Sequence, residues 1–578
     1  MANYYTDEKN VQIVVALLKK HGIKKIISSP GSANSPLTVS LQIDTFFEIY
    51  SSVDERSAAY IACGLAAESG EPVVISCTGA TASRNYLPGL TEAYYRKLPV
   101  LAITSTRKVT KIGHLVDQVM DRTVLPRDVA KISVTLPIVE DQDDVWECEI
   151  KVNQAILELK RHGGGPSHIN LPTSYLGTFN TLELPDVRFI NRITVNDKFP
   201  ELPKCKIAVF IGSHVTFTKE QTTAIENFCT VNNAVVLCDH TSGYYGKYKV
   251  LFPLINTQIY LEKNSLMPDI LIHIGEISAF FSSFISYPKH VWRVSEDGEI
   301  RDTFLQLSYI FEMSEQSFFE FYSPQKNDYK NEYCQLWIHH FTKISERIPE
   351  LPFSNVWIAQ QLAHKIPKDS VIHFGILNSL RSWSYFELTT SVTSASNVGG
   401  FGIDGNLSSL LGASFAQKDK LYFCIVGDLA FFYDMNALGN RHVENNLRIL
   451  LVNNGKGTEF KLYMHKTAEF ENVDDYVTAA GHYGNKSTEL VKNYVTDLGF
   501  EYLSASNKEE LLTVYKDFIN PVITEKPKLL EVFTNDYDEN QAHILMSQIE
   551  TSIKGKTKQF AKNILGENVV NTLKKIIK

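Results

Sequence analysis

Short apolar runs rich in β-branched residues alternate with longer segments of helical character through residues 1–185. KKIISS, PVVISCTG and PVLAITST are typical of strands, whereas VQIVVALLKKHG, RSAAYIACGLAAESG and ATASRNYLPGLTEAYYRK are typical of helices. The first of these helices should end near Gly22. Buried strands that alternate with helices indicate a parallel sheet covered on both faces.

The same alternation returns twice further along the chain. KIAVFIGS, NAVVLCD and DILIHIG follow Pro200, and DSVIHFG, LYFCIVGD, LRILLVNN and KLLEVF follow Val356. A length of 578 residues also suits about three domains. We therefore predict an α/β fold in three domains, each with a mostly parallel sheet flanked by helices. The expected boundaries are 1–185, 186–355 and 356–545, followed by a tail at 546–578, and the first and third domains look like two versions of one architecture.

The tail differs in charge from the rest of the chain. Residues 554–578 contain seven Lys and one Glu, and Phe560, Ile564, Leu573 and Ile577 can share one face of a helix. Such a segment suits a membrane surface or a partner protein, but it also suits a solvated helix whose apolar side packs on the body. Both interpretations stay open, and the first would place the protein at the inner face of a membrane.

Composition excludes several classes of protein. A hydrophobic content of 44% and a charged content of 21% indicate a folded chain rather than overall disorder. The net charge of −8 argues against a dedicated nucleic-acid binder. A membrane span needs about 18 consecutive apolar residues, and no apolar run in the sequence is that long. The start of the chain also lacks the apolar core of a signal peptide. The eight cysteines are scattered without a C-x-x-C pair, so we expect a reducing, cytoplasmic compartment.

Two strand ends in the third domain bear polar groups that suit a metal ion. LYFCIV ends in Gly427-Asp428, and LRILLVNN ends in Asn453-Asn454. Ligands bind at the carboxyl ends of strands in open α/β sheets. A carboxylate and an amide oxygen suit Mg²⁺, which otherwise uses water and phosphate oxygens.

A glycine-rich stretch lies just upstream, in GGFGIDGNLSS at residues 399–409. Its glycines allow a close approach of the backbone to a ligand, and a helix that starts near Asn406 could direct its N–H groups at a phosphate. The chain has neither a G-x-x-x-x-G-K-[ST] P-loop nor a G-x-G-x-x-G that opens a βαβ unit, which weakens nucleotide and nicotinamide interpretations.

With these segments in view, the chain resembles the thiamine-diphosphate-dependent enzymes, and within them the SEPHCHC synthases of menaquinone biosynthesis. The resemblance covers most of residues 8–540. It includes SSPGSANSPL, DERSAAYIACGLA, CTGATASRNYLPGLTEA, GFGIDGNLSS, GDLAFFYDMNAL and VNNGKGTEF. It implies thiamine diphosphate and Mg²⁺ as cofactors, and FAD is not expected.

The resemblance also assigns roles to individual residues. It implies catalytic roles for Glu55, whose carboxyl would relay a proton to the cofactor's aminopyrimidine, and for Gln118, near the reacting carbonyl. It implies cofactor binding by Glu55, Thr78, Gly79, Gly402, Ile403, Gly427, Asp428, Leu429, Asn454 and Lys456. It implies a metal held by Asp428, Asn454 and the backbone oxygen of Lys456. It implies substrate contacts from Ser32, Asn34, Arg107, Asp117, Ser379, Arg381, Glu459 and Phe460.

Glu55 and Asp428 lie in different predicted domains, and in the family the two halves of the cofactor are held by different subunits. The resemblance therefore implies a homo-oligomer, a dimer or a dimer of dimers, with the cofactor at the interface.

The substrate pocket departs from the pattern of the SEPHCHC synthases. Ala33, Trp383 and Val398 stand where that pattern has arginines, Asp117 where it has Asn, and Glu459 where it has an apolar residue. The loss of three cations should weaken the binding of anionic substrates, and Glu459 should repel them, unless Arg381 or Arg84 compensates.

We therefore predict a transferase or lyase that decarboxylates a 2-oxo acid and joins the product to an aldehyde or ketone acceptor. A sugar-like acceptor from surface-polysaccharide biosynthesis is one expectation. The alternatives are SEPHCHC synthase itself, a simple 2-oxo acid decarboxylase, and a non-catalytic protein that binds the cofactor.

Overall fold

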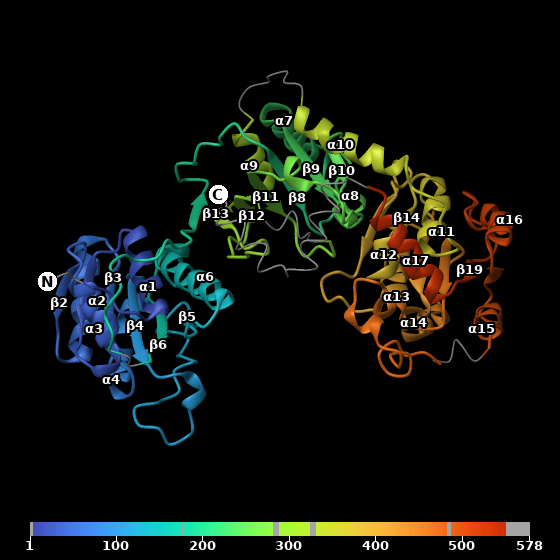
Figure 1. Ribbon diagram of the computed structural model, residues 1–578. Helices are drawn as coiled ribbons and strands as arrows, with labels where there is room; N and C mark the ends of the chain where they lie inside the picture. The colour runs from blue at the N-terminus through green and yellow to red at the C-terminus, as the bar shows by residue number, and fades with distance from the viewer. Residues whose placement is uncertain (1–3, 175–176, 281–287, 324–330, 482–486, 551–578) are drawn as a thin grey trace. The chain divides into compact units, whose positions relative to one another are not determined.

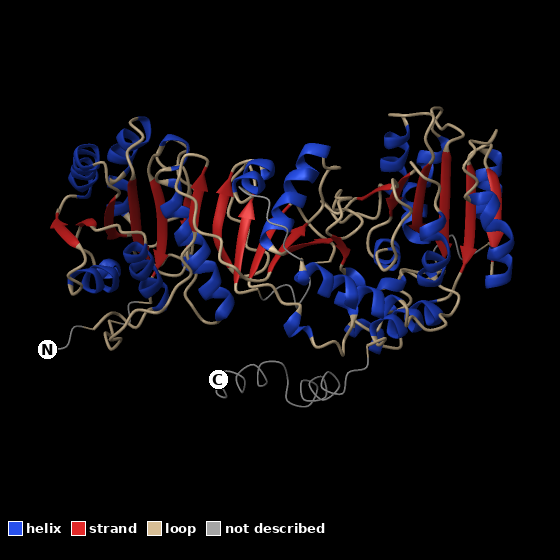
Figure 2. Cartoon of the chain, turned by 90° about the horizontal axis from the view of Figure 1, so that it is seen from above, coloured by secondary structure: helices blue, strands red, loops and turns tan. Residues whose placement is uncertain are grey.

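The computed structural model describes residues 4–174, 177–280, 288–323, 331–481 and 487–550. It contains three parallel sheets with helices on their faces, which confirms the predicted fold class (Figures 1 and 2). The chain divides into two compact units. Unit 1 comprises residues 1–199 and 297–312, and unit 2 comprises residues 200–296 and 313–578.

Unit 1 is built on a six-stranded parallel sheet in the order β2-β1-β3-β4-β6-β5. Its strands are β1 (Lys25–Ser28), β2 (Glu48–Ser51), β3 (Val73–Thr78), β4 (Val100–Thr106), β5 (Ser133–Thr135) and β6 (Ser167–Pro172). Its helices are α1 (Lys9–Lys20), α2 (Ser35–Gln42), α3 (Glu55–Ser69), α4 (Thr81–Asn85), α5 (Leu87–Tyr95) and α6 (Gln142–Glu158). Two apolar clusters cover the sheet. One includes residues of α1 and α6, and the other includes residues of α3 and α5.

Small residues let α3 and α5 approach each other closely. A Cβ at Gly89 on α5 would lie 2.4 Å from the Cβ of Ala59 on α3. Asp54 caps the start of α3 by accepting from the Ser57 N–H, and Gly70 ends the helix with a φ of 68°. The predicted helix over ATASRNYLPGLTEAYYRK is split into α4 and α5, because Pro88 lacks an N–H and belongs in the first turn of a helix.

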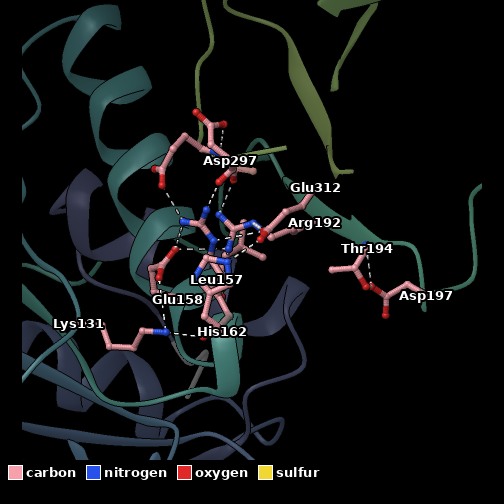
Figure 3. Close-up of polar contacts among 12 residues, drawn as sticks. Lys131, Leu157, Glu158, His162, Arg192, Thr194, Asp197, Asp297 and Glu312 are labelled. Atoms are coloured by element: carbon pink, nitrogen blue, oxygen red, sulfur yellow. Dashed lines mark hydrogen bonds and ion pairs between the residues drawn. The ribbon is translucent and has the colours of Figure 1, made fainter. Parts of the chain in front are cut away.

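Unit 1 also contains the parallel pair β7 (Asn191–Thr194) and β13 (Leu307–Glu312). Figure 3 shows the polar network that joins this pair to the end of α6. Arg161 contacts Glu158 at 2.9 Å, Glu299 at 2.8 Å and Glu312 at 3.2 Å. Arg192 on β7 adds a contact of 3.4 Å to Glu312. These contacts between oppositely charged side chains therefore hold residues 297–312 against the end of α6.

The first sheet of unit 2 pairs five parallel strands in the order β10-β9-β8-β11-β12. They are β8 (Ile207–Ile211), β9 (Ala234–Cys238), β10 (Lys249–Leu251), β11 (Ile270–Ile274) and β12 (His290–Val294). The accompanying helices are α7 (Lys219–Asn232), α8 (Pro253–Thr257), α9 (Glu315–Phe321) and α10 (Glu332–Ser345). Every residue of β8, β9 and β11 is buried, as expected for strands covered on both faces.

The second sheet of unit 2 has the order β15-β14-β16-β17-β19-β18. Its strands are β14 (Val371–Phe374), β15 (Thr393–Ser396), β16 (Tyr422–Gly427), β17 (Leu447–Asn453), β18 (Glu501–Ala505) and β19 (Lys528–Phe533). Its helices are α11 (Asn355–Leu362), α12 (Asn378–Trp383), α13 (Asn406–Ser414), α14 (Asp428–Asp434), α15 (Leu490–Asp497), α16 (Lys508–Phe518) and α17 (Asp536–Ser547). Counted along the chain, its strand order repeats that of the sheet in unit 1.

The two units do not correspond one to one with the three predicted domains, and the boundaries at 185, 355 and 545 stay predictions. The basic segment 554–578 lies outside the described residues. Within the part that is described, no helix is both long and apolar enough to cross a membrane.

Candidate active site

A cleft opens in unit 2 at the carboxyl ends of β14, β16 and β17, with about 700 Å³ of empty space that is open to solvent. Six of the predicted cofactor residues line it together: Ile403, Gly427, Asp428, Leu429, Asn454 and Lys456. Three predicted substrate residues, Ser379, Glu459 and Phe460, line it as well. Parallel pairing explains the meeting, because β16 and β17 are in register with Gly427 opposite Val452. Asp428 and Asn454 therefore leave neighbouring strands at the same edge.

Asp428 is a buried carboxyl, only 4% exposed. Burial raises its pKa to about 7, although the backbone N–H groups of Leu429 and Gly455 donate to it. The side-chain oxygen of Asn454 is also buried, and it has no hydrogen-bond partner among the described residues. A carboxylate short of positive charge and an unsatisfied amide oxygen in one cleft fit a hard divalent cation.

The ammonium of Lys456 is paired with two acids of the chain. Its Nζ lies 2.8 Å from Asp474 Oδ2 and 3.1 Å from Asp536 Oδ2. Its backbone oxygen accepts from the Thr458 N–H at 3.0 Å. A carbonyl has a second lone pair, so this oxygen can still face a metal, as the resemblance implies.

The glycine-rich stretch places Ile403 on the cleft wall, half-buried, with Gly402 just before it. α13 begins at Asn406, as predicted. The Ser408 N–H in its first turn donates to Asp434 Oδ2 at 2.7 Å, and the Ser408 hydroxyl donates to Asp434 Oδ1 at 2.5 Å. That N–H is therefore used within the chain rather than offered to a phosphate, and α14, which starts at Asp428, is the helix that begins in the cleft.

Glu459 is paired with Arg381. Two guanidinium nitrogens of Arg381 donate to the two carboxylate oxygens of Glu459 at 2.6 Å and 2.9 Å, and His465 Nε2 lies 2.9 Å from the same carboxylate. Burial alone would raise the pKa of Glu459, but the hydrogen bonds and charge of Arg381 outweigh it and lower that pKa. The expectation that Glu459 repels anionic substrates therefore needs revision, since its charge is compensated from within.

Trp383 and Val398, which replace two expected arginines, are core residues. Trp383 is fully buried, and its indole N–H donates to Asn355 Oδ1 at 3.1 Å. Val398 is 3% exposed. Neither position therefore presents a polar group to the cleft.

The predicted residues of unit 1 lie at the carboxyl edge of its sheet. Glu55 is the first residue of α3, half-buried, and Thr78 is the last residue of β3. Burial raises the pKa of Cys77 to about 12, and the nearby charge of Glu55 adds to that rise. Gly79 is packed so tightly that a Cβ there would lie 2.4 Å from Arg122 Nη1. Glu55 thus lies near the end of β3, where the resemblance expects the pyrimidine.

Ser32 is exposed, whereas Asn34 is completely buried. Asn34 Nδ2 donates to the Ser29 carbonyl, Thr38 Oγ1 and Ser76 Oγ within 3.2 Å, and Asn34 Oδ1 accepts from Ser105 Oγ at 3.1 Å. The polar atoms of Asn34 are therefore engaged in joining the ends of β1, β3 and β4.

Arg107 follows β4 and forms an ion pair of 3.2 Å with Asp117. Gln118, the next residue, is exposed and has a φ of 57°. Asp117 therefore offers Arg107 a counter-ion from within the same loop.

Sequence reasoning missed four polar residues of the cleft: Asn355, Asn378, Thr458 and Glu539. Asn378 Nδ2 donates to Thr458 Oγ1 at 3.0 Å, and burial raises the pKa of Glu539 to about 7. Thr458 lies inside the quoted motif VNNGKGTEF and Asn378 adjoins Ser379, so proximity in sequence could have indicated both. Glu539 on α17 gives no such signal.

Comparisons with known proteins agree with this geometry. Residues 9–125 match the family "Thiamine pyrophosphate enzyme, N-terminal TPP binding domain". A 2-succinyl-5-enolpyruvyl-6-hydroxy-3-cyclohexene-1-carboxylate synthase of Bacteroides thetaiotaomicron is 34% identical, over 92% of this chain and 97% of the relative. Proteins of the same name from Bacteroides fragilis and Christiangramia forsetii are 32% and 30% identical, and each alignment covers at least 90% of both chains.

Proposed function

Because the chain belongs to the thiamine pyrophosphate enzymes, with similarity to SEPHCHC synthases over most of its length, we propose that it decarboxylates a 2-oxo acid and transfers the remaining acyl group to an acceptor. The observation that supports this most is the meeting in one cleft of the buried Asp428 carboxyl and the buried, unsatisfied side-chain oxygen of Asn454.

The residues of this cleft fit Mg²⁺ and a diphosphate. Asp428, Asn454 and the Lys456 carbonyl would hold the metal, and Ile403 would support the bend of the cofactor. Thiamine diphosphate supplies, when bound, a nucleophilic carbon and an electron sink. Glu55 Oε would exchange a proton with the aminopyrimidine, and the apolar wall around Ile403 and Leu429 would limit the access of water.

Glu55 belongs to unit 1, whereas Asp428 belongs to unit 2. We propose that one active site takes Glu55 from one subunit and Asp428 from another, so that the working form is a homodimer or a dimer of dimers. Thr78, Gly79, Arg107 and Gln118 would complete the site from the side of Glu55.

The relatives support a reaction of the SEPHCHC type, decarboxylating addition of 2-oxoglutarate to isochorismate, better than a role in surface-polysaccharide biosynthesis. A second candidate keeps the same chemistry but uses another 2-oxo acid. The Arg381–Glu459 pair favours it, because the pair neutralises a cation that a second carboxylate would need.

The test is to measure CO₂ release from a panel of 2-oxo acids with thiamine diphosphate and Mg²⁺, in the presence and absence of isochorismate and of aldehydes. We expect cofactor-dependent CO₂ release and a carbon–carbon bonded product. An aldehyde as the sole product would indicate a simple decarboxylase, and binding of the cofactor without turnover of any acid would indicate a non-catalytic role.

Glu55→Gln should abolish turnover while thiamine diphosphate still binds, because the amide keeps the shape of the side chain but cannot relay a proton. Calorimetry checks the binding and CO₂ release checks the turnover. Full activity in this variant would contradict the proposed role of Glu55.

A further inference from the structure

One acid on the wall of the cleft, Glu459, is held in an ion pair. Arg381 on α12 and Glu459, just after the loop that follows β17, meet through two parallel hydrogen bonds of 2.6 Å and 2.9 Å. Their side chains are 18% and 10% exposed. A guanidinium binds a carboxylate in this two-pronged geometry. Glu459 therefore fills the position on Arg381 that the carboxylate of a ligand would take.

Neighbouring groups hold the pair in place. Asn378 Oδ1 accepts from Arg381 Nη1 at 3.1 Å, on the same side as the Glu459 contact. His465 Nε2 lies 2.9 Å from Glu459 Oε1. A ligand carboxylate could reach Arg381 only by displacing Glu459 from both partners.

Among the described residues that line the cleft, no other cationic side chain is open to an anion. The described lining includes the acids Asp428, Glu459 and Glu539, and the cation Lys456. The ammonium of Lys456 lies against Asp474 and Asp536. A metal ion at Asp428 would be matched by the diphosphate that it binds, so it would leave no excess positive charge for a second carboxylate.

From these contacts we infer that Glu459 is a specificity residue: it takes the place of a substrate carboxylate on Arg381, so that the cleft selects 2-oxo acids without a second carboxylate. The inference rests on the proposed function for the identity of the ligand as a 2-oxo acid, and of the two candidates given there it favours the one that uses an acid other than 2-oxoglutarate.

A similar pairing occurs in unit 1, where Arg107 contacts Asp117 at 3.2 Å. Asp117 is 73% exposed, so this pair is weaker and more easily opened than the Arg381–Glu459 pair. It supports the inference because a second arginine near the predicted site also has an acid of this chain as its partner.

The test compares ligands of equal length that differ by one carboxylate. Glutarate and pentanoate are titrated into the full-length protein with thiamine diphosphate and Mg²⁺ present, and binding is followed by calorimetry. The wild type should bind pentanoate at least as tightly as glutarate. Glu459→Gln should bind glutarate about tenfold more tightly than the wild type does, with pentanoate affected less than about twofold.

Three controls separate specificity from damage to the fold. Glu469→Gln removes an exposed acid from the same region and should leave both affinities unchanged. Glu459→Asp keeps the negative charge and should keep the wild-type order of ligands. The double variant Arg381→Met/Glu459→Gln removes the freed guanidinium and should lose the gain in glutarate affinity.

Wild-type protein that binds glutarate tenfold more tightly than pentanoate would overturn the inference, and this comparison stands even if Glu459→Gln does not fold. A folded Glu459→Gln variant without a gain in glutarate affinity would overturn it as well. Turnover of 2-oxoglutarate and 2-oxopentanoate is measured in parallel. Absence of CO₂ from every acid would count against the proposed function, whereas the binding data alone decide the role of Glu459.

Discussion

Asp428 and Asn454 bring a buried carboxyl and a buried amide oxygen into the cleft. The Asp428 carboxyl is buried enough for its pKa to rise to about 7, and the Asn454 oxygen has no partner among the described residues. One divalent cation would satisfy both the Asp428 carboxylate and the Asn454 oxygen. Burial of these groups costs stability when no cation is bound, and the same groups would bind the metal tightly.

Asp428→Asn should weaken Mg²⁺-dependent binding of thiamine diphosphate by at least about tenfold, because the amide removes the ligand's negative charge. The melting temperature without Mg²⁺ should stay the same or rise, since a buried charge is removed. Calorimetry and thermal melts measure the two effects. Asp419→Asn, at an exposed position, is the control, and unchanged cofactor affinity in Asp428→Asn would contradict the metal site.

Single residues also mark what could be predicted from the sequence. Asp428 and Asn454 were predictable, because each directly follows an apolar strand and parallel strands end at one edge. The Arg381–Glu459 pair was not, since it joins side chains from separate elements whose directions the sequence pattern leaves open. Asn34 is similar: its position was predictable, but its complete use in internal hydrogen bonds was not.

At the scale of elements, apolar runs predicted the sheets well, because buried strands such as β16 and β17 are mostly apolar, with Arg448 as the one charged residue in the two strands. Helix limits were less predictable. Pro88 splits one expected helix into α4 and α5, and the first turn of α13 is satisfied by Asp434, which is distant in sequence. Local signals fix the kind of element and, at Pro88, the position of a break, whereas the contact that satisfies the first turn of α13 depends on a partner elsewhere in the fold.

The strand β6 contains a buried histidine with a consequence for stability. His168 Nε2 lies 2.8 Å from Thr104 Oγ1, and His168 Nδ1 lies 2.8 Å from Ser133 Oγ. Burial, aided by the charge of Arg122, lowers the pKa of His168 to about 3. The unfolded chain, with a histidine pKa of about 6.5, therefore binds more protons than the folded chain between these two values.

The free energy of unfolding should be highest above pH 6.5 and should fall as the pH is lowered from about 6.5, by up to about 1.4 kcal/mol per pH unit for this group. His168→Gln should show a shallower decline than the wild type when apparent melting temperatures are followed against pH. His442→Gln, at an exposed position, serves as the control, and identical slopes for His168→Gln and the wild type would contradict the assignment.

At the scale of the molecule, the first and last sheets share one strand order, and the proposed active site draws on both. The sequence suggested this duplication through its repeated alternation of strands and helices. It did not indicate that residues 297–312 associate with unit 1, because the Arg161 and Arg192 network joins side chains that are distant in sequence.

Mixing two inactive variants tests the sharing of the site between subunits. At a thiamine diphosphate concentration too low to saturate Asp428→Asn, Glu55→Gln and Asp428→Asn should each be nearly inactive alone. Refolded or co-expressed mixtures should recover about a quarter of wild-type activity, because random pairing makes half of the dimers mixed and one of the two sites in each mixed dimer has both residues intact. CO₂ release measures the recovery, and light scattering measures the mass. A mixture that stays inactive, with mixed dimers shown to form, would contradict a shared site.

The burial of Trp383 constrains how this cleft can change during evolution. An arginine introduced there would replace a fully enclosed indole, leave Asn355 Oδ1 without its donor and place a charge in the core. Glu459 lines the cleft, where an exchange to glutamine keeps the shape of the side chain and removes only the charge that faces Arg381. A lineage that acquires or abandons dicarboxylic substrates would therefore pass through a change at Glu459 first, with the tryptophan as the slower, later step.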